Sequence, residues 1–409
     1  MRRGVVVLLL LVTSALVACE QSGPASAVEA TASHSEGIAS GRAAPSPIAG
    51  ALGGAVDVGY ARADSVRALQ FPADHGSHPD FRSEWWYFTG NLLATNGRRF
   101  GFQLTLFRRA LAPASGPTRA SRFATRQAWM GHFALSDVDA NVNQSNQSQS
   151  KHQRGGGQFY AFERLERGAA GLAGARAQPF KIWLRDWQVS GAEGSASPEP
   201  FPLHVHAAES GIELDLRLER GKAKVLQGEA GLSRKNAEPG NASYYYSYTR
   251  MPAAGRVRTA NGEFQVSGLA WLDREWSSSA LSADQVGWDW FALHLNDGRD
   301  LMLYRLRNQR GETHPFSAGV LVAANGTKTS LAVEQISFEP GRLWRSAHGA
   351  QYPVVWKLRA GTLQLQVTAL FDAQAHRGRL RYWEGAVRAR GSDGTHAVSA
   401  SGYLEMTGY

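Results

Sequence analysis

Cysteine is almost absent from this chain, since Cys19 is the one cysteine among 409 residues. A single thiol cannot form an internal disulfide or a cysteine-based zinc site. No apolar run reaches the roughly 18 residues that a membrane-spanning helix requires. Lysine is scarce as well: only seven of the 44 basic residues are lysines, and the arginines are scattered rather than clustered. Despite the formal net charge of +9, we therefore predict no nucleic-acid binding.

Familiar catalytic signatures are also missing. The sequence has no nucleophile elbow, P-loop, dinucleotide fingerprint, HExxH motif or Ser-His-Asp signature. Hydrolysis through a conventional covalent serine is therefore unsupported, and no cofactor is expected. Apolar residues at helical spacing are scarce, so helices are not expected to build the core.

The first residues have the organisation of an export signal, with two arginines ahead of an apolar stretch. A signal peptide is predicted over residues 1–18. The sequence Leu16-Val17-Ala18-Cys19 resembles the bacterial lipobox, so Cys19 is the expected lipidation site. Glu20 then favours the outer membrane, which implies a lipid-anchored protein of the bacterial cell envelope that faces the periplasm. The alternative is a plain secretory signal in which the cysteine is incidental.

The rest of the chain divides by composition. Residues 19–66 are rich in Ala, Ser, Gly and Pro and nearly free of aromatics, which predicts a flexible tether. Beyond them, short stretches of alternating polar and apolar residues are separated by Gly, Asn and Asp, which predicts an all-β fold. The segment 250–263, with its proline and glycines, is the expected boundary between one β domain at 67–250 and another at 251–409.

Two expected hairpins resemble each other at an offset of 201 residues. The first follows the aromatic run Trp85-Trp86-Tyr87-Phe88 and turns at Asn96-Gly97, and the second follows Trp288-Asp289-Trp290 and turns at Asp297-Gly298. This similarity hints at an internal duplication. A two-residue turn at Asp297-Gly298 would place Tyr304 opposite Phe291 and diagonal to Asp289.

Asp273 and Glu275 are the leading candidates for chemistry. On a strand they share one face with Trp271, and alternate Cα atoms lie about 6.5–7 Å apart. Like charge and an apolar wall both raise a carboxyl pKa, so one acid would stay protonated as a general acid while the other stays ionised. The alternative is a surface strand on which either acid pairs with Arg274 or another arginine.

Aromatic residues suggest a pocket for an apolar guest. On a strand, Trp85 and Tyr87 share one face while Glu84 and Trp86 share the other, so one aromatic face is left to hold a ligand. A core strand rich in aromatics is the alternative. Further candidates for the pocket are Trp276, Trp290 and Tyr304, and Tyr304 could equally be a core tyrosine.

Histidines offer two more possibilities. His132 lies in an apolar strand, where it is a candidate proton carrier or a structural residue. His75 and His78, with neighbouring carboxylates, could ligate a metal. However, Gly76 and Pro79 mark a loop whose polar groups could simply cap the next strand, and no metal is predicted.

Four stretches resemble the AttH family, which is related to carotenoid 1,2-hydratases: FPADHGSHPDFRSEWWYFTGNL, FGFQLTLFRRAL, GHFALSD and WLDREWSSS. The resemblance implies two lipocalin-like β-barrels packed together, with a hydrophobic ligand held in or between them. Trp276 and Tyr304 match the pattern of the hydratases. Arg274 and Leu306 stand where those enzymes are expected to have a histidine and an aspartate, which disfavours their mechanism unless Asp273 or Glu275 substitutes.

The combined prediction is an envelope lipoprotein that acts on an apolar or amphipathic small molecule, such as a lipid or isoprenoid, by acid-assisted hydration or hydrolysis. Asp273 or Glu275 would supply the proton, with help from Glu84 or His132. The family resemblance also allows a non-catalytic lipid-binding protein that works with an ABC-transporter permease. A metal-dependent hydrolase that uses His75 and His78 is a third alternative.

Overall fold

The computed structural model describes residues 58–114, 120–121, 123–140, 156–194, 197–279, 281–282 and 284–409. The predicted signal peptide, Cys19 and most of the predicted tether lie outside these residues. The described residues all belong to one compact unit. Among them, no helix has both the length and the apolar character needed to cross a membrane.

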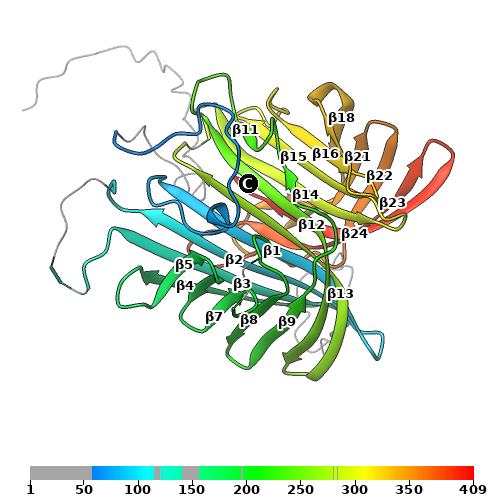
Figure 1. The fold of residues 1–409 in the computed structure, drawn as a ribbon. Coiled ribbons are helices and arrows are strands. Elements are labelled where there is room, and N and C mark those ends of the chain that lie inside the picture. The colour runs from blue at the N-terminus through cyan, green and yellow to red at the C-terminus, as the bar shows by residue number, and fades with distance from the viewer. Residues whose placement is uncertain are drawn as a thin grey trace, which may run out of the picture. The chain divides into compact units, whose positions relative to one another are not determined.

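Alternating apolar residues build two antiparallel sheets, each curled into a nearly closed barrel (Figure 1). Within the described residues, the first sheet has thirteen strands in the order β4-β3-β2-β1-β13-β12-β9-β8-β7-β6-β5, and β10 and β11 also pair with β12. These strands are β1 (Ser83–Ala94), β2 (Arg99–Ala110), β3 (Gln127–Asp137), β4 (Gln158–Arg167), β5 (Ala173–Ala177), β6 (Phe180–Leu184), β7 (Trp187–Ser190), β8 (Leu203–Glu209), β9 (Ile212–Leu218), β10 (Val225–Leu226), β11 (Leu232–Arg234), β12 (Ala242–Thr259) and β13 (Gly262–Ser277).

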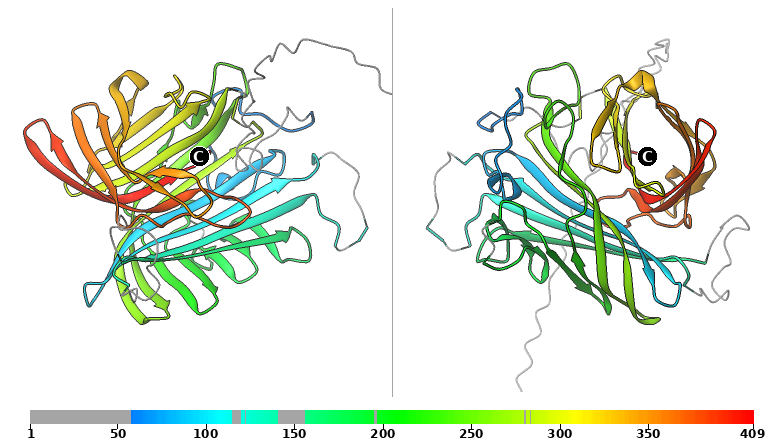
Figure 2. Two further views of the ribbon diagram at one scale, coloured as in Figure 1. Left: turned by 180° about the vertical axis from the view of Figure 1, so that it is seen from behind. Right: turned by 45° about the vertical axis from the view of Figure 1, so that its right-hand side comes forward.

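The second sheet, in the part of the chain that the structure describes, has nine strands in the order β17-β16-β15-β14-β24-β23-β22-β21-β18, and the right-hand view of Figure 2 shows it nearly end-on as a ring. Its strands are β14 (Gln285–Leu295), β15 (Asp300–Asn308), β16 (Ala318–Val322), β17 (Lys328–Leu331), β18 (Ile336–Pro340), β21 (Val355–Ala360), β22 (Leu363–Ala369), β23 (Trp383–Asp393) and β24 (His396–Met406). A small separate ribbon pairs β19 (Leu343–Arg345) with β20 (Gln351–Pro353), and the described residues include the 3-10 turns η1 (Ala73–His75) and η3 (Val333–Gln335).

The two sheets repeat one topology, in agreement with the duplication suggested by the hairpins. In each sheet the last strand returns to pair with the first, β13 with β1 and β24 with β14. The all-β class and the two-barrel architecture predicted from the sequence are thus confirmed.

The register of the second hairpin differs from the prediction by one residue. The backbone N–H of Leu295 donates to the carbonyl of Arg299 at 2.8 Å, so three residues form the turn, and Gly298 supplies its positive φ of 87°. Tyr304 consequently pairs with Trp290 rather than with Phe291, and Arg305 pairs with Asp289. This shift matters for the site because it places Trp290 and Tyr304 side by side on one face of the sheet.

The division between the sheets falls between β13 and β14, not near residue 250 as predicted, because β12 and β13 both belong to the first sheet. The glycine and proline of the segment 250–263 have local roles instead. The register of β12 shifts between Tyr248 and Met251, and a Cβ at Gly255, whose φ is +155°, would overlap the carbonyl oxygen of Asp215. These residues therefore mark an irregular strand and not a linker.

The last residues of the predicted tether also pack on the first sheet. Ala63 is fully buried, the backbone N–H of Ala61 donates to the carbonyl of Asp80, and the Tyr244 hydroxyl donates to the carbonyl of Ser65 at 2.9 Å. Residues 58–66 are thus part of the folded unit, because tertiary contacts hold a segment whose own composition favours disorder.

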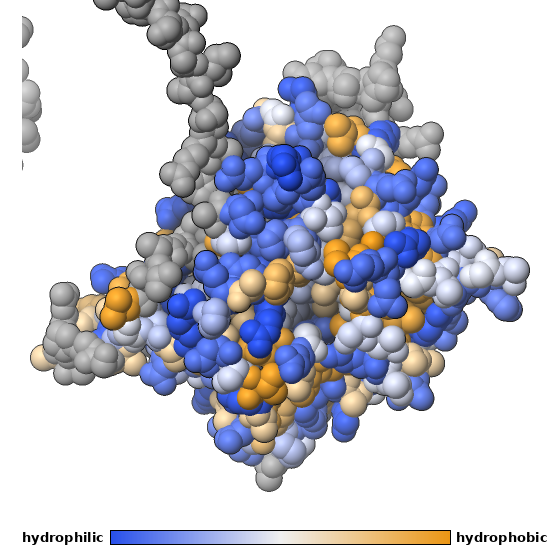
Figure 3. Space-filling model, turned by 90° about the horizontal axis from the view of Figure 1, so that it is seen from above, coloured by the Kyte–Doolittle hydropathy of each residue, from blue (hydrophilic) through white to orange (hydrophobic). Residues whose placement is uncertain are grey.

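Each barrel encloses a core of its own. The first is filled by large aromatics that include Trp86, Trp129, Trp187 and Trp276, and the second by Phe291, Trp356 and Trp383. On the face seen in Figure 3, polar side chains predominate and apolar side chains gather towards the middle. Both barrel interiors are therefore occupied by side chains.

Candidate functional site

A third apolar cluster lies where the two sheets meet, and it surrounds a cavity of about 140 Å³. The first sheet contributes residues of β1, β2, β12 and β13, and the second contributes residues of β14, β15, β23 and β24. The amide of Asn91 fastens the sheets near this cluster by donating to the carbonyl of Gly402 at 2.9 Å. The apolar and aromatic lining consists of Trp85, Tyr87, Phe107, Tyr245, Leu281, Trp288, Trp290, Tyr304, Leu306, Leu380 and Tyr382.

Six of the residues singled out in the sequence line this pocket: Trp85, Tyr87, Asp273, Glu275, Trp290 and Tyr304. Asp273 and Glu275 are 4% and 6% exposed, so they do not form the solvated surface pair that was the alternative. The alternation of β13 turns both acids toward the second sheet.

Asp273 is held by three donors of the first sheet. The Tyr245 hydroxyl and the Trp271 indole N–H each lie 2.8 Å from its carboxyl oxygens, and the Ser247 hydroxyl donates as well. Burial raises the pKa of Asp273 to about 7, with a further contribution from the negative charge of Glu275, although the three hydrogen bonds oppose the change. Asp273 can therefore exchange a proton near neutral pH.

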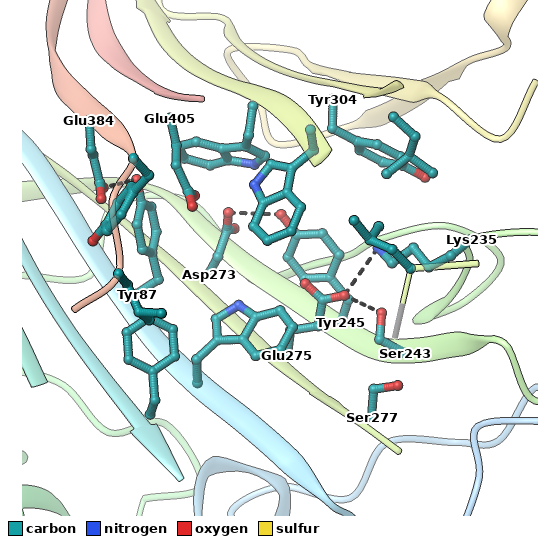
Figure 4. A pocket seen from close by; sticks show the side chains of 18 of the residues that line it. Tyr87, Lys235, Ser243, Tyr245, Asp273, Glu275, Ser277, Tyr304, Glu384 and Glu405 are labelled. Atoms are coloured by element: carbon teal, nitrogen blue, oxygen red, sulfur yellow. Dashed lines mark hydrogen bonds and ion pairs between the residues drawn. The ribbon is translucent and has the colours of Figure 1, made fainter. Parts of the chain in front are cut away.

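Glu275 has a different environment only two residues away. It accepts a hydrogen bond from Ser243, and its Oε1 lies 3.1 Å from the Lys235 ammonium, which also sits above the Tyr304 ring (Figure 4). Burial disfavours the charged form of Lys235, but the charge and hydrogen bond of Glu275, together with Tyr304 and Asp273, outweigh burial, so the pKa of Lys235 is raised. Glu275 thus belongs to an ion pair, which makes Asp273 the better candidate for proton transfer.

The second sheet supplies two acids that the sequence analysis missed, Glu384 of β23 and Glu405 of β24. Figure 4 shows the carboxyl groups of Asp273 and Glu405 pointing toward one another. Burial raises the pKa of Glu405 to about 8, and the negative charges of Asp273 and Glu275 add to this effect. Burial likewise raises the pKa of Glu384 well above its usual range, and the Tyr87 hydroxyl donates to its carboxyl group.

A signal for Glu405 was present in the sequence. It interrupts the apolar run Tyr403-Leu404-Glu405-Met406, where a carboxyl group is costly unless its strand turns it toward other polar groups. Glu384 and Lys235 carry no comparable signal, because only the meeting of distant strands brings them to the pocket.

Two predicted site residues lie elsewhere. Glu84 and Trp276 pair with each other across β1 and β13, and both face the interior of the first barrel. Glu84 is fully buried between the guanidinium groups of Arg108 and Arg274, and Trp276 stacks on His78 at 4.0 Å between ring centroids. Contrary to the prediction, Glu84 and Trp276 do not line this pocket, because alternation turns them away from the face that carries Asp273 and Glu275.

Trp271 and His132 lie just behind the pocket wall. Trp271 packs edge-on against Trp290 and holds Asp273 through its indole N–H. His132 lies in β3 with 1% of its surface exposed, and its Nδ1 is 2.6 Å from the hydroxyl of Tyr382, which lines the pocket. Trp271 thus contacts the pocket lining through Asp273, and His132 contacts it through Tyr382.

The histidines proposed as metal ligands have protein partners. His75 contacts the Tyr246 hydroxyl at 2.7 Å and the Pro198 carbonyl at 3.0 Å, so both of its ring nitrogens are engaged. The ring nitrogens of His78 contact Glu84 at 3.1 Å and Asp74 at 2.9 Å. These contacts brace the loop before β1, in keeping with the capping alternative.

Comparisons with known proteins agree with this architecture. The AttH-like family model matches residues 62–409. A crystal structure from Nitrosomonas europaea, described as a candidate AttH, is 32% identical with a TM-score of 0.71, and the match covers 85% of this chain and 99% of that chain. Kievitone hydratase from Nectria haematococca shares the fold at 14% identity and a TM-score of 0.59, covering 85% of this chain and 95% of that enzyme. No curated protein matches the chain in sequence.

Proposed function

Because the chain belongs to the AttH-like family and its two barrels enclose a pocket with opposed carboxyl groups, we propose that it adds water to an unsaturated bond of an apolar or amphipathic small molecule by general acid–base catalysis. The single observation that carries this proposal is the pair of facing acids, Asp273 and Glu405, whose pKa values are raised to about 7 and about 8. Kievitone hydratase, which shares the fold, is by its name a hydratase.

The chemistry divides between the two acids. Glu405, protonated at neutral pH, gives its proton to one carbon of the double bond, and the cationic charge develops on the other carbon beside the aromatic wall. Water attacks that carbon and passes a proton to the Asp273 carboxylate. One C–O and one C–H bond form, and the proton then moves from Asp273 to Glu405, which restores the starting state.

Hydrolysis through a serine is less well supported by the pocket. Ser243 donates its hydroxyl proton to Glu275, and Lys235, its pKa raised, is held as an ammonium ion beside that carboxylate. The lysine therefore cannot accept a proton from the serine, and among the described residues Ser243 has no histidine partner of the kind that activates a serine hydroxyl as a nucleophile.

The size of the cavity limits the part of the substrate that can be enclosed. Its volume of about 140 Å³ is close to the roughly 150 Å³ of an engineered apolar cavity that holds benzene. We therefore expect one ring or one short branched unsaturated unit to enter, with any longer chain left outside.

The proposal is tested with an apolar extract of the source cells, incubated with the purified protein in water enriched in ¹⁸O. We expect a product heavier than its precursor by one labelled water. Asp273→Asn should lower the rate of its formation by about 10²–10⁴, while Glu219→Gln, on the exposed surface, should leave it unchanged. Formation of the product at the wild-type rate by Asp273→Asn would refute the assignment. Binding and release of an extract component unchanged would favour the lipid carrier that works with an ABC-transporter permease.

Tyr245→Phe should move the titration of Asp273 to higher pH. The Tyr245 hydroxyl stabilises the ionised form of Asp273, so its loss raises the pKa of Asp273, by about one pH unit for one hydrogen bond to a charged group. The carboxyl ¹³C signal of Asp273, assigned with Asp273→Asn, measures the change. Tyr304→Phe is the matched control, since Tyr304 lines the same pocket without a hydrogen bond to Asp273. An unchanged titration in Tyr245→Phe would contradict this account.

We also propose that the protein works at the cell envelope through a lipid on Cys19, a proposal that rests on the lipobox-like sequence and on the tether. Cys19→Ser should move the protein from the membrane fraction to the soluble periplasmic fraction, because the lipid is the expected anchor. Cell fractionation measures the change of location, and labelling with a fatty acid measures the loss of the lipid. Continued membrane association of the unlabelled variant would disprove the anchor.

A further inference from the structure

A second cavity, of about 470 Å³, lies beside the first. It is bounded by β4 on the first sheet and by the segment that precedes β23 on the second. Glu163 and His376 line it, and Leu380 lines both cavities. The two spaces are thus separated by little more than one layer of side chains.

Titratable side chains bridge that layer. Glu163 Oε2 in the second cavity is 3.6 Å from His132 Nε2, and His132 Nδ1 on the other side of the ring is 2.6 Å from the Tyr382 hydroxyl. Tyr382 lines the first cavity together with Glu384, whose buried Oε2 has no hydrogen-bond partner among the described residues. The sequence of groups Glu163, His132, Tyr382 and Glu384 therefore runs from one cavity to the other.

The surroundings hold this bridge in place. The ring of His376 stacks on Tyr382 with centroids 4.5 Å apart, and its Nε2 is 2.9 Å from Gln103 Oε1, while the Gln103 amide donates to Tyr382 at 3.1 Å. His132 Nε2 is buried and makes no hydrogen bond among the described residues. Buried side-chain nitrogens are mostly hydrogen-bonded, as both ring nitrogens of His75 are, so the open Nε2 of His132 calls for an explanation.

We propose that Glu163, His132 and Tyr382 carry protons from the second cavity to Glu384, and so maintain the acids of the reaction pocket. The inference rests on the proposed function for its purpose, though not for its test. In each transfer, His132 takes a proton at Nε2 and releases one from Nδ1 to the Tyr382 oxygen, whose own proton passes to Glu384. One proton enters at Glu163 and one reaches Glu384. The relay is ready again when the His132 imidazole has returned to its first tautomer and the Tyr382 hydroxyl has turned back.

The test is hydrogen–deuterium exchange of the protonated Glu384 carboxyl, followed by infrared spectroscopy after transfer of the purified protein to D₂O. The carbonyl band is assigned by its loss in Glu384→Gln. Tyr382→Phe and His132→Phe should slow the deuterium shift of this band by at least about tenfold. Tyr403→Phe is the matched control, because Tyr403 also lies close to Glu384 but is not part of the bridge.

Chemical rescue separates transport from structure. In His132→Ala, added imidazole should restore the exchange rate because its ring can take up and release a proton, whereas the phenyl ring of His132→Phe fills the same space without doing so. Wild-type exchange in both Tyr382→Phe and His132→Phe would overturn the relay while leaving the hydration proposal intact. Slow exchange in these variants with no labelled product from the cell extract would support the relay and refute the hydration. Absence of the Glu384 band from the wild type would refute the relay, because its end point would then be ionised.

Discussion

Replacing Glu405 with glutamine is expected to stabilise the folded protein increasingly as the pH rises, while abolishing hydration. In the folded protein the pKa of Glu405 is raised from 4.5 to about 8. A carboxyl group with a raised pKa favours the folded state fully below about pH 4.5, and this contribution is lost as the pH rises toward 8, because only the unfolded chain ionises freely. At about 1.4 kcal/mol for each pH unit between the two values, the wild type loses at most about 5 kcal/mol, which the neutral amide avoids.

Urea unfolding at about pH 5 and about pH 8.5 measures this effect. The difference in unfolding free energy between Glu405→Gln and the wild type should be small at the lower pH and several kcal/mol in favour of the variant at the higher pH. The control is Glu219→Gln, whose exposed carboxyl is paired with Arg217. A stability difference between the variant and the wild type that does not grow from the lower to the higher pH would show that the pKa of Glu405 is not raised in the folded protein, and that Glu405 is no general acid.

Replacing Glu84 with glutamine should have the opposite effect, a loss of about 3–5 kcal/mol of stability near neutral pH. Glu84 is fully buried between Arg108 and Arg274, and the Arg274 guanidinium lies 3.8 Å from the centre of the Trp86 ring. Removing the carboxylate would leave two buried guanidinium groups without a counter-charge. Denaturant unfolding at pH 7 measures the loss, and Glu219→Gln should change stability by less than about 1 kcal/mol.

The pH dependence of this second effect has the reverse sign. Although burial opposes it, the charges of Arg274 and Arg108 hold the pKa of Glu84 far below its usual value of 4.5. The stabilisation by Glu84 is therefore present above about pH 4.5 and is lost as the pH falls. Glu84→Gln should approach the wild type in stability under acidic conditions. A variant as stable as the wild type at pH 7 would show that the buried cluster does not support the first barrel.

Glu84 and Asp273 show which features of the site could be predicted from the sequence and which could not. The alternation of polar and apolar residues correctly paired Trp85 with Tyr87 and Asp273 with Glu275, because successive side chains on a strand point to opposite faces. It could not decide which face meets the second barrel, since both faces of β1 carry aromatics. Glu84 was assigned to the pocket for this reason, although it faces the core.

Other errors had equally local causes. The turn at Asp297-Gly298 contains one residue more than the sequence suggested, and this single residue moved Tyr304 from Phe291 to Trp290. The proline and glycines of 250–263 resemble a linker in composition, yet they lie in a long irregular strand whose partners come from elsewhere in the chain. Composition describes a segment but not what packs on it.

The all-β class, the repeated hairpins and the two acids on one face of β13 could be read from the chain alone, because they depend on the local alternation of side chains. The position of the cavity between the barrels, and the meeting of Lys235, Glu384 and Glu405 with Asp273 there, depend instead on contacts between distant strands. The proton affinities of these groups follow from burial and from neighbouring charges, which arise only when distant strands enclose them away from water.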